Sequence, residues 1–108
     1  MADNKPSGKL VRDKIPEIIM ASGTSPITRI LDQSEYKESL FEKLNEEVLE
    51  VQSADAHHVA EEIADVLEVL MALSVATGLN WDEIEQLRLS KIEERGRFEK
   101  RIWLQQEP

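Results

Sequence analysis

Two pairs of carboxylate side chains in the middle of the chain have the spacing of metal ligands on helices. Glu47 and Glu50 are three residues apart, and so are Glu62 and Asp65. Residues at i and i+3 lie on one face of a helix with β-carbons about 5–6 Å apart, where like charges repel unless a cation lies between them. Hard dications prefer oxygen ligands, whereas zinc and iron sites usually include His or Cys. The two pairs predict a site for Mg²⁺, with Mn²⁺ as the alternative.

The excess negative charge of the chain falls on the same segment. The formal net charge is −9 over 108 residues, yet no Lys or Arg occurs between Leu44 and Leu87, where eleven acidic residues lie. Solvated helices usually place Lys four residues from Glu, which stabilises them by about 0.2–0.5 kcal/mol per pair. Either these carboxylates point into water, or a cation that the sequence does not supply lies among them. This acidic balance argues against a nucleic-acid partner, which requires a basic face.

A solvated helix face is the alternative interpretation of each carboxylate pair taken alone. Both pairs on consecutive helices, beside an apolar seam and in a segment without Lys or Arg, favour a metal site instead. His57 and His58 lack the Glu-x-x-His spacing of carboxylate di-iron bundles, so we interpret them as surface or capping residues. Trp81 stands just inside a helix start and is interpreted as a packing anchor rather than a platform for a base.

Four helices are expected to position these groups within a single domain, residues 1–108. Capping residues, apolar positions recurring every three to four residues and helix-ending glycines predict helices over 15–22, about 34–53, 56–77 and 81–95. The segments 26–31 and 98–104 are expected to be extended and are candidates to lie side by side. Residues 1–8 are expected to form a flexible lead-in. The predicted fold class is all-α, an antiparallel bundle of about four helices.

The helix expected over 56–77 is apolar nearly all round, so we expect it to be central. Three further modest helices cannot cover it on every side, which predicts a homo-oligomer, a dimer or a tetramer, that completes the core. The short connection after Ser53 predicts an antiparallel pair with the preceding helix. Glu47 borders the apolar seam of that helix. Glu47 and Glu50 are therefore expected to face Glu62 and Asp65.

The composition limits the classes of protein that the chain can belong to. Apolar residues make up 41%, charged residues make up 32%, and Cys is absent. This composition fits a globular domain and excludes a disulfide scaffold and a thiolate zinc site. The longest apolar run, Val69 to Val75, is much shorter than the roughly 20 residues that span a bilayer, and the first residues lack the apolar stretch of a secretory signal. We therefore expect a cytoplasmic protein without a membrane partner.

A basic group follows the acidic segment on the last expected helix. Arg88, Lys91 and Arg95 lie at i, i+3 and i+7, so they share one helix face that suits phosphate oxygens. Salt bridges to neighbouring acidic residues are the alternative interpretation for each of them. A second, weaker basic cluster lies near the start of the chain and consists of Lys9, Arg12 and Lys14.

These motifs together resemble a known family. The run Glu46-Glu47-Val-Leu-Glu50, followed after eleven residues by Glu62-Ile-Ala-Asp65, resembles the EExxE…ExxD signature of the all-α, MazG-like nucleoside triphosphate pyrophosphohydrolases. The flanking runs KLVRDKIPEII at 9–19 and KIEERGRFEKRIWL at 91–104 are similar to the small phosphoribosyl-ATP pyrophosphohydrolase-like branch. Where many relatives read RGGF, this chain has Arg-Gly-Arg-Phe at 95–98.

The resemblance implies an α-helical oligomer that binds Mg²⁺ and a nucleotide polyphosphate. Its metal ligands would be Glu47, Glu50, Glu62 and Asp65, and members release pyrophosphate and leave a nucleoside monophosphate. Bound Mg²⁺ can neutralise the polyphosphate and lower the proton affinity of the attacking water. A spare carboxylate, Glu46, is predicted to orient or deprotonate that water.

Lys91 and Arg95 are predicted to bind the leaving pyrophosphate. Two alternatives stay open: a non-catalytic helical interaction module with an acidic face, and a metal-binding family member that lacks turnover. No aromatic or amide group is tied by its spacing to a nucleobase pocket, so the sequence predicts neither base nor sugar.

Overall fold

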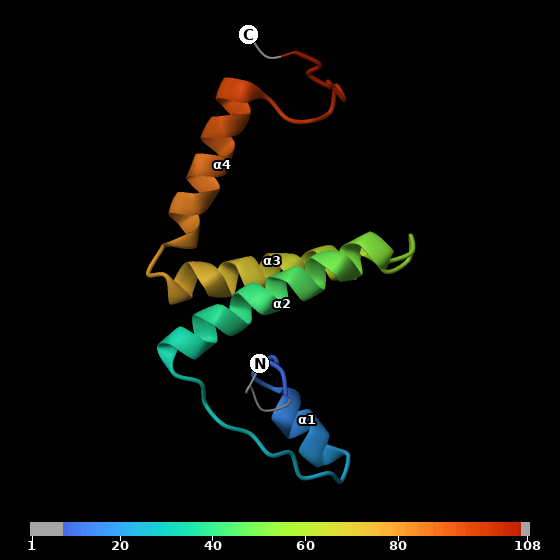
Figure 1. The fold of residues 1–108 in the computed structure, drawn as a ribbon, viewed down its shortest axis with the longest axis vertical. Coiled ribbons are helices and arrows are strands. Elements are labelled where there is room, and N and C mark those ends of the chain that lie inside the picture. Colours follow the sequence, from blue (N-terminus) through green and yellow to red (C-terminus); the bar gives the residue numbers. More distant parts are fainter. Residues whose placement is uncertain (1–7, 107–108) are drawn as a thin grey trace.

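The computed structural model describes residues 8–106, and this part of the chain contains four helices and no strand (Figure 1). The helices are α1 Ile15–Ala21, α2 Gln33–Ser53, α3 Val59–Ala76 and α4 Trp81–Arg95. The predicted all-α class and the predicted number of helices are confirmed. The expected flexible lead-in falls almost entirely on residues 1–7, outside the described residues.

Helix α2 begins at a capping box formed by Asp32, one of the two residues, with Ser34, that could cap it by sequence. The Asp32 carboxylate accepts the Glu35 backbone N–H at 2.8 Å, and the Glu35 carboxylate accepts the Asp32 N–H at 3.2 Å. The Arg29 guanidinium donates to both Glu35 oxygens, at 3.1 and 2.8 Å. These hydrogen bonds, that from Arg29 first, lower the pKa of Glu35 to about 2. The Glu35 carboxylate at this helix start is therefore held by two groups, the Arg29 guanidinium and the Asp32 backbone N–H.

Helix α3 begins three residues later than predicted, because residues 56–58 form a turn instead of the first helical residues. The Asp55 carboxylate accepts the backbone N–H groups of His57 and His58, at 2.9 and 3.1 Å, and lies 2.8 Å from the His58 Nδ1. The hydrogen bond with His58 is the main cause that lowers the pKa of Asp55. His57 and His58 are exposed surface residues, as predicted.

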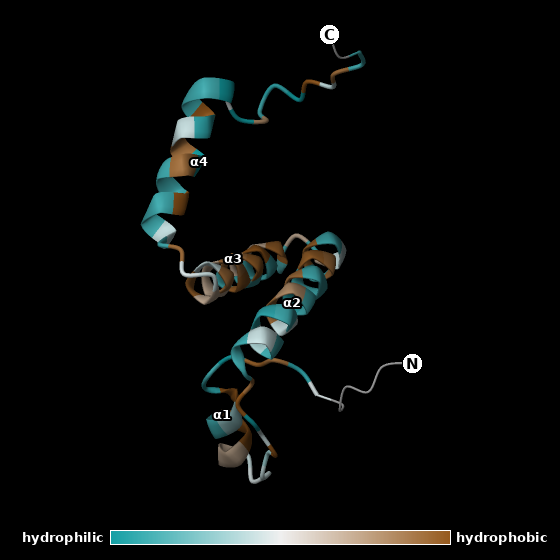
Figure 2. Cartoon of the chain, turned by 60° about the vertical axis from the view of Figure 1, so that its left-hand side comes forward, coloured by the Kyte–Doolittle hydropathy of each residue, from teal (hydrophilic) through white to brown (hydrophobic). Residues whose placement is uncertain are grey.

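Helices α2 and α3 form the antiparallel pair that the short connection predicts, and they lie side by side (Figure 1). Their contact buries Leu40, Val69 and Leu73, and Leu10 from the N-terminal segment packs against this cluster. Figure 2 shows α3 as the most hydrophobic helix, in contrast to the mixed colouring of α2 and α4. Helices α1 and α4 contribute no buried residue.

Helix α4 points away from the α2–α3 pair. Gly78, with a φ of 77°, ends α3, and the buried Ser74 hydroxyl donates to the Leu79 carbonyl at 3.0 Å. Gly96, with a φ of 82°, ends α4, and its N–H donates to the Ile92 carbonyl at 2.7 Å. Arg97, in the place of the second glycine of RGGF, is not among the residues with positive φ. This turn therefore needs only one glycine.

The predicted pairing of residues 26–31 with residues 98–104 is wrong for the single protomer. Both segments lack regular secondary structure. They lie at opposite ends of the molecule in both views, one between α1 and α2 and the other beyond α4 (Figures 1 and 2). The physical reason is the turn after α3, which directs α4 and the following segment away from the N-terminal half.

The protomer is far more open than a monomer of its size. Its radius of gyration is 18.3 Å, whereas a compact chain of this length has about 13 Å. Its accessible surface is 9830 Å², whereas a compact monomer of this mass exposes about 6,100 Å². Large apolar side chains of α3 are exposed, among them Ile63, Leu67, Leu70 and Met71. No helix in the described part of the chain is long and apolar enough to cross a membrane.

Candidate metal centre

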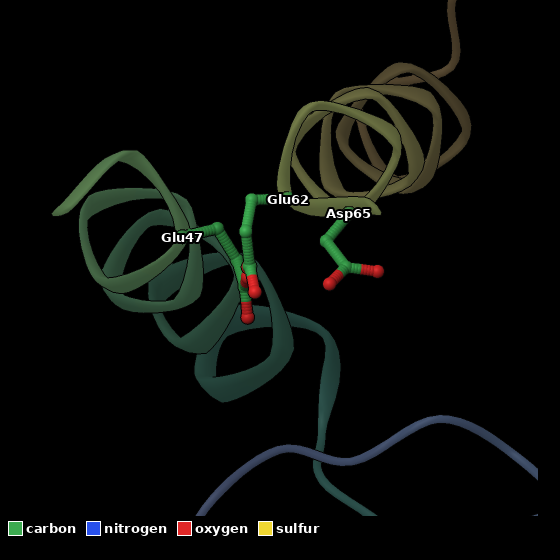
Figure 3. A group of neighbouring side chains, drawn as sticks. All are labelled: Glu47, Glu62 and Asp65. Carbon is green, nitrogen blue, oxygen red and sulfur yellow. The ribbon is translucent and has the colours of Figure 1, made fainter. Parts of the chain in front are cut away.

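Three predicted ligands converge between the two paired helices. Glu47 comes from α2, and Glu62 and Asp65 come from successive turns of α3. Each offers one carboxylate oxygen, and these oxygens lie within 4.8 Å of one another. Figure 3 shows the three carboxylates on the same side of the helix pair, with the Glu47 and Glu62 side chains running in the same direction between the two helices. We call these three residues the carboxylate cluster.

The cluster is partly withdrawn from solvent. Glu47 is only 9% exposed, and Glu62 and Asp65 are half-buried. Burial is the largest cause that raises the pKa of Glu62, followed by the negative charge of Asp65 and then by those of three further acids. A carboxylate in such surroundings is stabilised by gaining a proton or a cation. The metal-free cluster is therefore electrostatically unfavourable at neutral pH.

Two cations of the chain itself approach the cluster. The Arg12 Nη2 lies 2.7 Å from an oxygen of Asp65, and the Lys43 Nζ lies 3.4 Å from an oxygen of Glu47. The charge pattern predicted either carboxylates directed into water or an external cation, and these two internal cations are a third arrangement. The spacing of Lys43 and Glu47, four residues on one helix, was a signal that could have found one of them.

The other two predicted carboxylates on α2 lie outside the cluster. Glu50 is exposed, although its charge also raises the pKa of Glu62. Three residues rotate a helix by about 300°, so Glu50 points about 60° away from Glu47 and further from the apolar seam. Glu46 is exposed and lies 3.5 Å from the Lys43 Nζ. The roles predicted for these two residues stay predictions.

The predicted phosphate-binding residues do not lie near the cluster within one protomer. Lys91 and Arg95 are exposed on α4, which contacts α3 and is directed away from the α2–α3 pair (Figure 1). Neither has an ion-pair partner among residues 8–106. Arg88, in contrast, binds Glu85 on the same helix at 2.5 Å. The salt-bridge alternative is therefore correct for Arg88, and two basic side chains of this face are left unpaired in the described chain.

The donor atoms fit a hard dication. The cluster consists of carboxylate oxygens alone, and no His contributes to it in the described part of the chain. Mg²⁺ takes one or two carboxylates together with water and substrate phosphates, whereas Zn²⁺ and Fe favour nitrogen or sulfur. Glu47, Glu62 and Asp65 would hold such an ion.

Comparison with known proteins places the chain in a family. Residues 9–90 match the sequence model of the family described as phosphoribosyl-ATP pyrophosphohydrolase. The chain belongs to this family. The matched range includes the whole carboxylate cluster and Arg12, and it ends directly before Lys91. The family assignment therefore includes the carboxylate cluster but not the basic residues at the end of α4.

One relative of this phosphoribosyl-ATP pyrophosphohydrolase family chain is an uncharacterised protein of Mycolicibacterium smegmatis. The two are 50% identical over 52 residues, which make up 48% of this chain and 53% of the relative. The chain thus spans about half the length of this curated relative. No solved structure matches the chain.

Proposed function

We propose that this chain is a Mg²⁺-dependent nucleoside triphosphate pyrophosphohydrolase. It hydrolyses the α–β phosphoanhydride and gives a nucleoside monophosphate and pyrophosphate. The observation that carries the proposal is the convergence of Glu47, Glu62 and Asp65, whose oxygens lie within 4.8 Å of one another. Membership of a pyrophosphohydrolase family supports it.

Each of the predicted site residues has a separate role in the proposed hydrolysis. The carboxylate cluster and Glu50, one turn after Glu47, hold the dication. Bound Mg²⁺ supplies neutralisation of the polyphosphate and a lower pKa for water, so no side-chain nucleophile is needed. Glu46 orients or deprotonates the attacking water. Its exposed carboxylate and its loose contact with Lys43, at 3.5 Å, leave it available for this task.

Lys91 and Arg95 bind the leaving pyrophosphate in this proposal. Because α4 points away from the cluster of its own protomer, this role requires α4 of a second copy of the chain. The proposed enzyme is accordingly a homo-oligomer, a dimer or a tetramer. The excess accessible surface of the protomer and the exposed apolar side of α3 support this assembly.

An acidic interaction module is the competing function, and one observation favours it. Several carboxylates of the α2–α3 pair, such as Glu46, Glu50 and Glu61, are exposed and could bind a basic partner without a metal. The module accounts for the charge of this surface. It does not account for the convergence of a buried and two half-buried carboxylates on one point.

A magnesium titration and a nucleotide panel discriminate between the two functions. The enzyme should gain thermal stability with Mg²⁺, by about 2.7 kcal/mol at a hundred times the dissociation constant. It should also release pyrophosphate, and not orthophosphate, from at least one nucleoside triphosphate. A protein that is stabilised by Mg²⁺ but releases no pyrophosphate from any nucleotide is a member without turnover. A protein that shows neither response contradicts the proposal.

Substitution of Glu50 by Gln tests the fourth proposed ligand. We expect the variant to lose pyrophosphate release, because the dication loses a negatively charged ligand while the exposed side chain leaves the α2–α3 contact unchanged. Circular dichroism should show the helix content of the wild type. Release of pyrophosphate at the wild-type rate would restrict the site to the three residues of the carboxylate cluster.

A further inference from the structure

Arg12 is the residue outside α2 and α3 that contacts the carboxylate cluster. Its Nη2 donates to the Asp65 Oδ1 at 2.7 Å, across 53 residues of sequence. Arg12 has no role as a metal ligand or in the proposed hydrolysis. The contact therefore calls for a separate explanation.

The N-terminal segment is anchored so that Arg12 reaches the cluster. Leu10, two residues earlier, packs against the apolar core between α2 and α3. The Arg12 carbonyl accepts the Ile15 N–H at 3.0 Å, which fixes the start of α1 directly afterwards. Figure 3 shows the chain of this segment passing on the side toward which the three carboxylates point. The guanidinium is therefore held at the open side of the cluster.

The Arg12 guanidinium has hydrogen-bonding capacity to spare. The Arg12 side chain is 61% exposed and makes one hydrogen bond within the described part of the chain, although its guanidinium carries five N–H donors. Lys43 differs from Arg12 in both respects, because its side chain is 23% exposed and its ammonium contacts two carboxylates of its own helix. A planar fork of donors also matches two oxygens of one phosphate in a fixed bidentate geometry, whereas an ammonium acts as a point charge.

A metal ion at the cluster would change the partner of Arg12. A dication at Asp65 repels the guanidinium and competes with it for the same carboxylate. The nucleotide polyphosphate arrives at the same place and offers oxygens of higher charge. Arg12 would then exchange a carboxylate for a phosphate without a large movement of the chain.

We propose that Arg12 is a polyphosphate-binding residue that neutralises Asp65 in the metal-free protein and turns to the substrate phosphates when a dication binds. This inference rests on the proposed function, and it names a residue on which substrate binding depends. It assigns two measurable properties to one side chain: Arg12 opposes metal binding in the absence of nucleotide and favours nucleotide binding in the presence of metal.

The test compares Arg12→Gln with the wild type in two binding measurements. Titration with Mn²⁺ alone, followed by electron paramagnetic resonance, should show metal binding about two- to fivefold tighter in the variant, the range for loss of one exposed ion pair. Calorimetric titration with an α,β-methylene nucleoside triphosphate at saturating Mg²⁺ should show binding about 10- to 100-fold weaker, as expected for lost hydrogen bonds to charged oxygens. Arg12→Lys should keep the wild-type metal affinity, and its nucleotide affinity should lie between those of the wild type and Arg12→Gln.

Arg29→Gln is the matched control. It removes a comparably exposed arginine–carboxylate pair, with Glu35, about 18 Å along α2 from Glu47. Both affinities should stay at the wild-type values. Weaker Mn²⁺ binding by Arg12→Gln would show that Arg12 only positions Asp65, and unchanged analogue binding would show that it does not contact phosphate; either result overturns the inference. Because the analogue is not hydrolysed, a protein without turnover would refute the proposed function and leave this test intact.

Discussion

Substitution of Glu62 by Gln is expected to abolish pyrophosphate release and, at the same time, to raise the thermal stability of the metal-free protein. Glu62 is half-buried beside Asp65, and burial followed by the neighbouring negative charges raises its pKa. A neutral amide of the same size removes this unfavourable charge. It also removes a metal ligand, and because a bound dication contributes several kcal/mol to the reaction, we expect turnover to fall about 10³-fold or more.

The gain in stability should depend on pH in a definite direction. A carboxyl group whose pKa is higher in the folded chain favours folding while it is protonated. This contribution is complete below the ordinary pKa of 4.5 and is lost as the pH rises through the raised pKa of the folded state. Above the raised pKa, the wild type carries the negative charge in both the folded and the unfolded state, whereas the variant carries it in neither. The difference in Tm should therefore be largest near neutral pH and disappear as the pH falls below 4.5.

Glu61→Gln is the matched control for this prediction, since it removes the same charge from the adjacent, exposed residue of α3. It should leave turnover close to that of the wild type. Melting curves in EDTA from pH 4 to pH 8 and steady-state pyrophosphate release with Mg²⁺ provide the two measurements. A Glu62→Gln protein that melts below the wild type at pH 7 would contradict the electrostatic account, and one that turns over normally would contradict the site.

The parts of the fold that depend on local interactions could be predicted from the sequence. The apolar spacing of α2 and the Gly78 and Gly96 ends each act within a few residues, and the structure has them where they were expected. Of the two residues that could cap α2 by sequence, Asp32 and Ser34, the structure has Asp32 as the cap. The start of α3 was predicted three residues early, because the Asp55 side chain closes a turn instead of the first helical turn. The position of the segment after α4 depends on the geometry of a single turn. The spacing of apolar residues predicts helices, but it does not predict the direction of such a turn.

In the candidate site, too, the contacts within one helix could be predicted from the sequence, whereas those that depend on packing could not. Glu62 and Asp65 share one helix, so their spacing alone predicted their proximity, and the seam of α2 added Glu47. Glu50 fits the spacing equally well, but helix geometry turns it about 60° further from the seam, and in the structure its side chain is exposed. Arg12 could not be assigned to Asp65, because their contact across 53 residues exists only after Leu10 has packed against the core.

Substitution of Leu67 by Glu is expected to separate the proposed oligomer into protomers of 12.3 kDa. Leu67 lies two residues after Asp65, which places it about 200° around α3, on the side opposite the carboxylate cluster. Its neighbours on that side, Ile63 and Leu70, are also exposed in the protomer. A charge buried without a partner in an apolar interface costs several kcal/mol, enough to dissociate an assembly at micromolar concentration. Light scattering after size exclusion measures the mass directly.

Gln52→Glu is the control, because it adds the same charge at an exposed polar position of α2 and should leave the mass unchanged. An unchanged mass for Leu67→Glu, or a wild type that is already monomeric, would contradict the assembly.

The dissociated protomer also distinguishes metal binding from turnover. The carboxylate cluster lies between α2 and α3 of one chain, so Mn²⁺ binding should persist. Pyrophosphate release should be lost, because in the proposed assembly Lys91 and Arg95 act on the cluster of a second copy.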